Sequence, residues 1–350
     1  MKKAITVLIA ALILAALIFD AKNMTEAVRT SVETCLYIII PALFGFMAVS
    51  SYLIKSGLYR IIFKPFFLLF CCIIKLDEEE FGIFLLSLFG GYPVGAKLLA
   101  DNTELTDKYN ILPFCYCPSP GFVVTVAGIG LFSSAKAGFL IYISNLLACV
   151  ILAVLLTRKN KKSSVKTTYG FSPPVKLKQT DSPLQDVFIS SVMSASSSLF
   201  PVCAIIVTFG VIAQVFRFYF NVLGLSNPLN LFYAVLEISN ASSLPPNRAL
   251  LPLIAALFSF GGICIIMQIP ALTKGKISLK NFYLCRIPAA LMSAVLCRIL
   301  LPLFKINAAI PVTAGNTGFI KPTEAQNPIA SSALLIMAVI LLKTTQEKPV

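Results

Sequence analysis

The sequence LLSLFGGYPVGAKLLAD, residues Leu85–Asp101, is an apolar run with an interruption in its middle. Gly90-Gly91 permits backbone angles that other residues resist, and Pro93 suits the first turn of a new helix because it has no N–H group. The stretch therefore predicts two half-helices separated by a break. Within a membrane, such a break survives only against protein or a water-filled cavity, and broken helices of this kind hold solutes and ions in secondary transporters.

The rest of the chain is similarly apolar. It has 350 residues, of which 57% are hydrophobic and 13% charged, and its mean hydropathy is +0.87. The apolar residues form long blocks, which indicates an all-α polytopic membrane protein with roughly 7–10 membrane segments.

The composition also argues against an enzyme. The chain contains no histidine, which excludes His-based triads, a His general base and His-ligated metal sites. Its ten cysteines lie mostly singly in apolar runs without zinc-site spacing, so we interpret them as small packing residues. We therefore expect no catalytic residues, no metal and no cofactor.

Positive charge is concentrated in one polar stretch. The net charge is +14, and the segment from Arg158 to Lys178 carries seven Lys and Arg residues and no acid. Beside apolar blocks, such a segment is typical of a cytoplasmic loop, which can also contact anionic lipid heads, and not of a nucleic-acid site.

Several further membrane segments are expected along the chain. We predict a retained first helix over residues 4–19, a span over 31–53 and an interfacial helix over 58–74. Residues 138–156 are an uninterrupted span and 329–342 a last short one. The remaining apolar runs are expected to be interrupted by Gly, Pro or Ser: residues 111–132, 184–216, 249–269 and 281–304.

Local matches between the two halves indicate an internal repeat. Ser31-Val32 with Pro41 matches Ser191-Val192 with Pro201 at an offset of 160. Two further pairs match at offsets of 171 and 170: Phe89-Gly90-Gly91 with Phe260-Gly261-Gly262, and Phe114-Cys115 with Leu284-Cys285.

If both Gly-Gly segments are re-entrant and the basic loop is cytoplasmic, the number of membrane crossings gives the two repeats opposite orientations. The repeats are then inverted. That count places Lys274, Lys276 and Lys280 outside, against the charge rule. The predicted organisation is an N-terminal membrane helix (1–26), a first repeat (27–157), a basic cytoplasmic linker (158–183), a second repeat (184–305), and a polar loop with a C-terminal membrane helix (306–350).

Four blocks of residues resemble a known family. They are GGYPVGAK at Gly90–Lys97, FCYCPSPGF at Phe114–Phe122, LEISN at Leu236–Asn240, and FGG followed by a glutamine at Phe260–Gln268. Together they resemble the nucleoside-recognition (Gate) domain family, and within it the sporulation integral membrane proteins of the YlbJ type. The resemblance covers residues 28–304 and implies an architecture like that of concentrative nucleoside transporters.

The resemblance also implies a role. Sporulation members are associated with spore cortex formation and with moving dipicolinate across the membrane around the forespore. The chain departs from its relatives at Tyr116-Cys117, where Asn residues are usual, and at Ile263–Ile266, where a His is common. These departures bear on the substrate, and the family's name does not itself make nucleosides the ligand.

Candidate site residues gather at the expected helix breaks. Lys97, one turn past Pro93, is a candidate anion-binding residue beside the N–H groups of the half-helix; the alternative is an ion pair with Asp101 at i,i+4. Glu237 is a candidate proton or cation site, or else a solvated helix end. Arg286 is a candidate for meeting a carboxylate, or else an interfacial anchor. The full predicted set is Gly90, Gly91, Tyr92, Pro93, Lys97, Ser119, Glu237, Asn240, Gly261, Gly262, Gln268 and Arg286.

The leading hypothesis is a sporulation-associated transporter or permease in the cell membrane, or in the membrane around the forespore. Its expected partners are a small anionic or aromatic solute, the lipid bilayer and a coupling proton or cation, without nucleic acid. The alternatives are a non-transporting scaffold required for cortex assembly and a nucleoside-type transporter. The sequence leaves the oligomeric state open.

Overall fold

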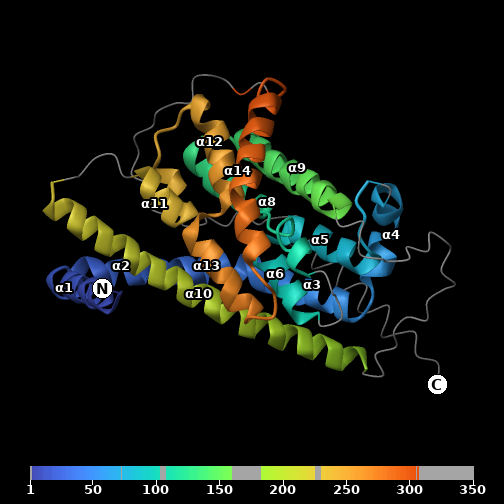
Figure 1. The fold of residues 1–350 in the computed structure, drawn as a ribbon, viewed down its shortest axis with the longest axis horizontal. Coiled ribbons are helices and arrows are strands. Elements are labelled where there is room, and N and C mark those ends of the chain that lie inside the picture. Colours follow the sequence, from blue (N-terminus) through green and yellow to red (C-terminus); the bar gives the residue numbers. More distant parts are fainter. Residues whose placement is uncertain are drawn as a thin grey trace. The chain divides into compact units, whose positions relative to one another are not determined.

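The computed structural model describes residues 2–71, 73–102, 108–159, 183–224, 230–304 and 306 (Figure 1). Within these ranges the regular elements are all helical. Five helical segments are long and apolar enough to cross a membrane: Ala21–Lys55, Ala135–Arg158, Leu184–Val222, Arg248–Thr273 and Lys280–Leu300. The prediction of an all-α integral membrane protein is confirmed at this level. Residues 160–182 of the basic linker and the last predicted span, 329–342, lie outside the described residues.

The N-terminal part consists of helix α1 and a long, nearly continuous helical rod. Helix α1 (Lys2–Phe19) is followed by α2 (Ala21–Thr34), which continues through a π-helical turn, η1 (Cys35–Ile39), into α3 (Ile40–Lys55). The π turn ends just before Pro41, where the missing N–H group disturbs the ordinary hydrogen-bond ladder. The chain then turns into the short helix α4 (Tyr59–Phe70), whose Phe67 ring packs edge-on against Phe81.

Helix α10 (Leu184–Val222) packs antiparallel to α2–η1–α3 along its length. Its residues approach the rod in reverse order, from Gln214 beside Asp20, through Cys203 beside Cys35, to Ser190 beside Lys55. We expected Ser194–Ser198 and Pro201 to break this segment, and that prediction is wrong. The hydroxyl groups of Ser197 and Ser198 donate to the carbonyl oxygen of Ser194 within the helix, so these serines fit its backbone without interrupting it.

The segment quoted first folds back on itself. Helix α5 (Glu78–Gly90) ends at Gly91, whose φ of 90° reverses the chain, and α6 (Tyr92–Asp101) returns. The side-chain amide of Asn102 donates to the carboxylate of Glu79, so the two ends of the segment meet. We call residues 78–102 hairpin A.

A second, shorter segment also returns. Helix α11 (Asn230–Leu236) and the 3-10 helix η3 (Ile238–Ser243) are joined at Glu237. The side-chain amide of Asn230 donates to the carbonyl oxygen of Ser243 at 3.2 Å, which ties the ends together. We call residues 230–243 hairpin B.

Two other segments are interrupted but continue onward. Segment A comprises α7 (Lys108–Ile111), an extended stretch, α8 (Pro120–Val123) and the π-helix η2 (Val124–Leu131), and it leads to α9 (Ala135–Lys159). Segment B comprises η4 (Arg248–Leu250), α12 (Leu251–Phe260) and α13 (Gly262–Thr273), and it leads to α14 (Lys280–Leu300).

The two Gly-Gly segments therefore differ. Hairpin A returns, whereas α12 and α13 make almost no contact with one another and together form one span-length segment of 26 residues. The count of membrane crossings assumed that both Gly-Gly segments are re-entrant, and this assumption does not hold for segment B. The expected break of α14 at Pro288 is also wrong, because the helix continues through that residue.

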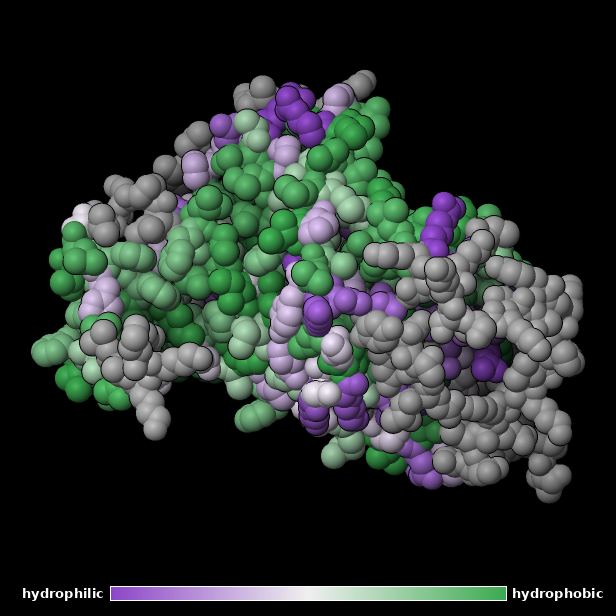
Figure 2. All heavy atoms as spheres, viewed as in Figure 1, coloured by the Kyte–Doolittle hydropathy of each residue, from purple (hydrophilic) through white to green (hydrophobic). Residues whose placement is uncertain are grey.

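The interior and the surface are both apolar. All of α6 from Tyr92 to Ala100 is buried, while α10 and α14 expose large apolar side chains such as Phe200 and Leu291. Figure 2 shows hydrophobic residues over much of the described face, with hydrophilic residues gathered in separate clusters. Such a surface suits a hydrocarbon solvent.

Candidate functional site

The tip of hairpin A rests on the interruption of segment A. A Cβ atom at Gly91 would lie 3.3 Å from Cβ of Ser119, so only a glycine allows this approach with the positive φ. Ser119 in turn caps α8, because its hydroxyl accepts a hydrogen bond from the amide of Phe122. The predicted site residues Gly91 and Ser119 are thus in contact, at two breaks in the chain.

The tip of hairpin B rests in the same way on the interruption of segment B. Gly262 has a φ of 74°, and a Cβ atom there would lie 3.2 Å from the backbone nitrogen of Ile238 and 3.3 Å from the carbonyl oxygen of Val235. Glu237 occupies the turn of this tip. Both glycine-containing breaks therefore allow close backbone approach.

Two tyrosines connect hairpin A and segment A with segment B. The Tyr92 hydroxyl donates to the carbonyl oxygen of Phe258, and the Tyr116 hydroxyl donates to that of Phe260 at 3.3 Å. The two rings lie 4.7 Å apart, and Tyr116 also touches Gly261. We call the two hairpin tips and the two interruptions, with these tyrosines between them, the central junction.

Arg286 lies against the central junction on α14. It is 2% exposed, and its guanidinium group is 4.5 Å from the centre of the Tyr116 ring and 4.7 Å from that of Phe282. It donates to the carbonyl oxygens of Phe282 and Pro113. The ion pairs among the described residues are Arg29–Glu33 and Lys97–Asp101, so no described acid neutralises Arg286. A buried cation without an acid is costly, and an anion bound beside it would reduce that cost.

Glu237 is half-buried at the tip of hairpin B. Its carboxylate accepts a hydrogen bond of 2.6 Å from the Ser239 hydroxyl. Asn240 supports the turn. Its backbone N–H donates to the carbonyl oxygen of Glu237, and its side-chain amide donates to the carbonyl oxygen of Tyr233. Neither described ion pair includes Glu237.

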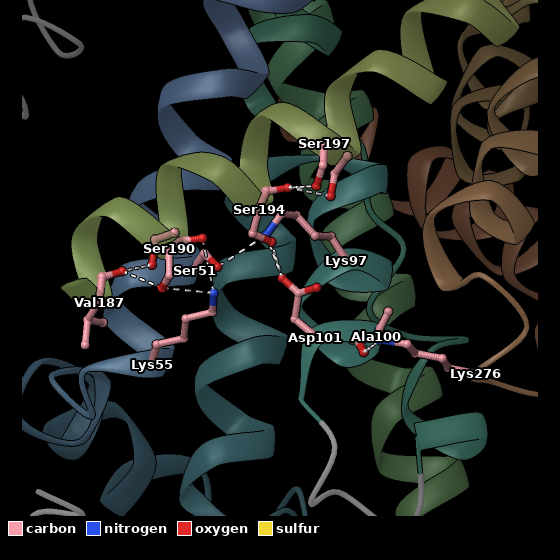
Figure 3. A network of polar contacts seen from close by, with 12 residues as sticks. Ser51, Lys55, Lys97, Ala100, Asp101, Val187, Ser190, Ser194, Ser197 and Lys276 are labelled. Atoms are coloured by element: carbon pink, nitrogen blue, oxygen red, sulfur yellow. Dashed lines mark hydrogen bonds and ion pairs between the residues drawn. The ribbon is translucent and has the colours of Figure 1, made fainter. Parts of the chain in front are cut away.

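Lys97 lies in a different polar network from the central junction (Figure 3). Its ammonium group is 2.8 Å from the Asp101 carboxylate and 3.2 Å from the Ser51 hydroxyl, and Ser194 donates to the same carboxylate oxygen. The i,i+4 alternative thus describes its pairing, although the lysine is 1% exposed and does not reach the surface. The network ties α6 to α3 and α10, and a role for Lys97 in binding stays a prediction.

The remaining predicted residues have local packing roles in the structure. A Cβ atom at Gly90 would collide with the Phe46 ring of α3, and Pro93 is buried in the first turn of α6. Gln268 is buried on α13 and donates to the Cys264 sulfur at 3.7 Å. Their part in binding a solute is not tested by these contacts.

Sequence reasoning missed two features of the interior. Tyr116 was noted only as a departure from the family pattern, although it contacts Tyr92, Phe282, Arg286 and Gly261. Asn145 of α9 and Ser293 of α14 both donate to the carbonyl oxygen of Ala255, and Oδ1 of Asn145 has no partner in the described part of the chain. Polar residues within apolar runs were the available signal for both.

The structure describes no group of three or more Cys, Asp or Glu side chains that could hold a metal ion. Comparison of the chain with protein-family models, with curated proteins and with solved structures gave no match.

Proposed function

We propose that this protein is a membrane transporter or permease for a small anionic solute, which binds at the central junction. The observation that carries the proposal is Arg286, a buried guanidinium group without a described acidic partner, placed where two hairpin tips and two interrupted segments converge. Helix breaks that meet inside the membrane are the usual places for solute binding in secondary transporters.

The arrangement supports two inverted repeats. Each half has a long Pro-containing rod, a hairpin, an interrupted segment that touches the tip of that hairpin, and a long helix. The two rods are antiparallel, with Pro41 and Pro201 both near the middle of their contact. A two-fold axis through that point, perpendicular to the rods, would lie in the membrane plane.

This arrangement revises the correspondences between the halves. The offset of 160 relates the two rods and is kept. The offset of 171 relates hairpin A, which folds back, to segment B, which continues onward. The two Gly-Gly motifs are therefore not equivalent positions of the two repeats. In the revised scheme hairpin A corresponds to hairpin B, and Ser119 corresponds to the Gly261-Gly262 interruption.

The same scheme resolves the conflict over charge. Lys276 donates to the carbonyl oxygen of Ala100 at the end of hairpin A, and the neighbouring Asp101 contacts Ser194 near the start of α10. Lys55 also contacts α10, at Ser190. We assign all of these ends to the cytoplasmic side, because the basic linker directly precedes α10. The three lysines at 274, 276 and 280 then obey the positive-inside rule.

The resemblance to sporulation membrane proteins of the nucleoside-recognition family suggests the first solute to test. Dipicolinate is a small dicarboxylate, and a guanidinium group binds a carboxylate through two parallel hydrogen bonds. We propose the cell membrane or the forespore-surrounding membrane as the location. A scaffold role in cortex assembly and nucleoside transport are the outcomes that the following experiment separates.

The test is uptake into liposomes that contain the purified protein, over a panel of dipicolinate, other small mono- and dicarboxylates, and nucleosides. We expect uptake of a carboxylate, and a larger loss in Arg286→Met than in Arg286→Lys, because lysine keeps the charge but not the bidentate geometry. One lost charge-assisted pair corresponds to roughly a tenfold to hundredfold lower uptake rate. Arg298→Met is the matched control, since Arg298 is exposed on the same helix.

The outcomes are distinct. Uptake of nucleosides without carboxylates would favour the nucleoside-type transporter. No movement of any solute by correctly inserted protein would favour the scaffold. Equal uptake by Arg286→Met and the unmodified protein would overturn the assignment of Arg286.

A further inference from the structure

The two hairpins are held very differently by the rest of the protein. Hairpin A is anchored through Lys97, Asp101 and Asn102, and α6 is buried from Tyr92 to Ala100. Hairpin B is shorter, and Ser239 and Asn240 are half-buried while Leu231 and Ser243 are exposed. Elements with few buried contacts open most readily. Hairpin B is therefore the more easily opened of the two.

The negative charge of the Glu237 carboxylate, at the tip of hairpin B, is stabilised by few neighbouring groups. Its described hydrogen bond comes from Ser239, and neither described ion pair includes it. The ionisable side chains that interact with it within the described residues are Arg217 of α10, Cys35 of η1 and Cys264 of α13. Arg217 lies over the Tyr233 ring, at 5.0 Å. The packed elements η2 and α12 contribute no charged residue.

We infer that Glu237 is a proton-binding site that controls the opening of hairpin B. Water supplies the proton and takes it back, so the step is the interconversion of a carboxylate and a carboxylic acid. Burying the charged form costs more than burying the neutral form. Closure of the tip onto Gly262 therefore favours the protonated state, and loss of the proton favours opening toward water.

For transport, the consequence rests on the proposed function: uptake would be coupled to a proton that enters and leaves at this tip. The opening itself does not depend on the identity of any solute. It can therefore be tested without one.

The native thiol of Cys264 is a suitable reporter, because it lies on α13 near Glu237 and is 1% exposed. Purified protein in lipid nanodiscs is treated briefly with a maleimide over a range of pH, and each cysteine is quantified by peptide mass spectrometry. Labelling of Cys264 is divided by that of the half-buried Cys285, which corrects for the change in thiol reactivity with pH. Cys297, buried on α14, reports any general unfolding.

We expect the Cys264 ratio to rise with pH by up to about tenfold per unit, the limit for release of one proton. Glu237→Gln imitates the protonated form and should remain protected at every pH. Ser239→Ala removes the donor that stabilises the carboxylate, so its transition should move to higher pH. Glu26→Gln, which changes an exposed acid on α2, should behave like the unmodified protein.

A flat Cys264 ratio in the unmodified protein, or an unchanged pH dependence in Glu237→Gln, would overturn the inference. Transport and gating can fail separately. The expected labelling without uptake of any solute would keep the proton-binding tip and discard the transporter. Arg286-dependent uptake together with a Cys264 ratio that does not change with pH would keep the transporter and discard the proton-binding tip.

Discussion

At the scale of single residues, contacts decide which glycines are required. Gly95 lies in the middle of α6, and a Cβ atom there would be 2.1 Å from the carbonyl oxygen of Cys115 and 2.9 Å from Cβ of Ser87. Gly45 lies in α3, and a Cβ atom there would meet no atom within 4 Å. The sequence alone does not distinguish the two.

We predict opposite effects of alanine at these positions. Gly95→Ala should lower the free energy of unfolding by about 1–3 kcal/mol, because the methyl group has no room. Gly45→Ala should raise it by about 0.5–1 kcal/mol through the helix preference of alanine. Thermal unfolding of both variants in one detergent checks the prediction, and equal stabilities would contradict the packing around α6.

The candidate site shows the limits of sequence reasoning at this scale. The break at Gly91 and the pairing of Lys97 with Asp101 were predictable because both are local: a Gly-Gly pair and an i,i+4 spacing. The contact of Tyr116 with Arg286 joins segments far apart in the chain, so it has no local pattern. The sequence named Arg286 as a candidate beside Lys97 and Glu237, but it gave no sign that Arg286 packs against Tyr116.

At the scale of elements, the Lys97–Asp101 network joins hairpin A to the two long rods. The two members of the ion pair are buried unequally, with side-chain exposures of 1% for Lys97 and 31% for Asp101. Removing one partner leaves the other unpaired, and the penalty depends on how deeply that remaining charge is buried.

We therefore predict an asymmetric result. Asp101→Asn leaves the buried ammonium group unpaired and should destabilise the protein by about 3–5 kcal/mol. Lys97→Met leaves a carboxylate that retains the Ser194 hydrogen bond and partial access to water, so it should cost less. The double variant should recover part of the loss, and Ser197→Ala, which removes a hydroxyl bonded within its own helix, is the control. Unfolding curves that show equal losses for the two single variants would contradict this burial.

Sequence patterns predicted some elements better than others. The Gly-Gly break in hairpin A follows from backbone freedom and was correct. The expected breaks of α10 and α14 at proline were wrong, since a helix can continue through proline when neighbouring groups take up the freed carbonyl. Whether an interrupted segment returns depends on contacts at its ends, such as that of Asn102 with Glu79, which no local motif encodes.

At the scale of the whole molecule, the proposed topology places the two ends of segment B on opposite sides of the membrane. Ser243 and Ser278 are exposed serines that flank this segment. In intact cells, an impermeant thiol reagent should label Ser243→Cys from outside and should label Ser278→Cys only after permeabilisation. Labelling of both cysteines from outside would show that segment B re-enters on the side from which it starts. It would also restore the count of crossings in which both Gly-Gly segments are re-entrant. Cysteines introduced into residues 159–178, of which 160–178 lie outside the described residues, should resist the reagent as Ser278→Cys does.

The tyrosine contacts across the central junction have a consequence for synthesis. Tyr92 and Tyr116 donate to carbonyl oxygens that lie 166 and 144 residues further along the chain. When the first half leaves the ribosome, the two tyrosine hydroxyls at its chain breaks enter the bilayer before the carbonyl groups that accept their hydrogen bonds exist. Exposed backbone breaks are not stable in lipid, so the nascent first half must be sheltered by the insertion machinery, or wait at the interface, until the second half arrives. Biogenesis of this protein should accordingly be slow at its midpoint, and a chain truncated after the basic linker should be degraded unless the missing half is supplied as a separate polypeptide.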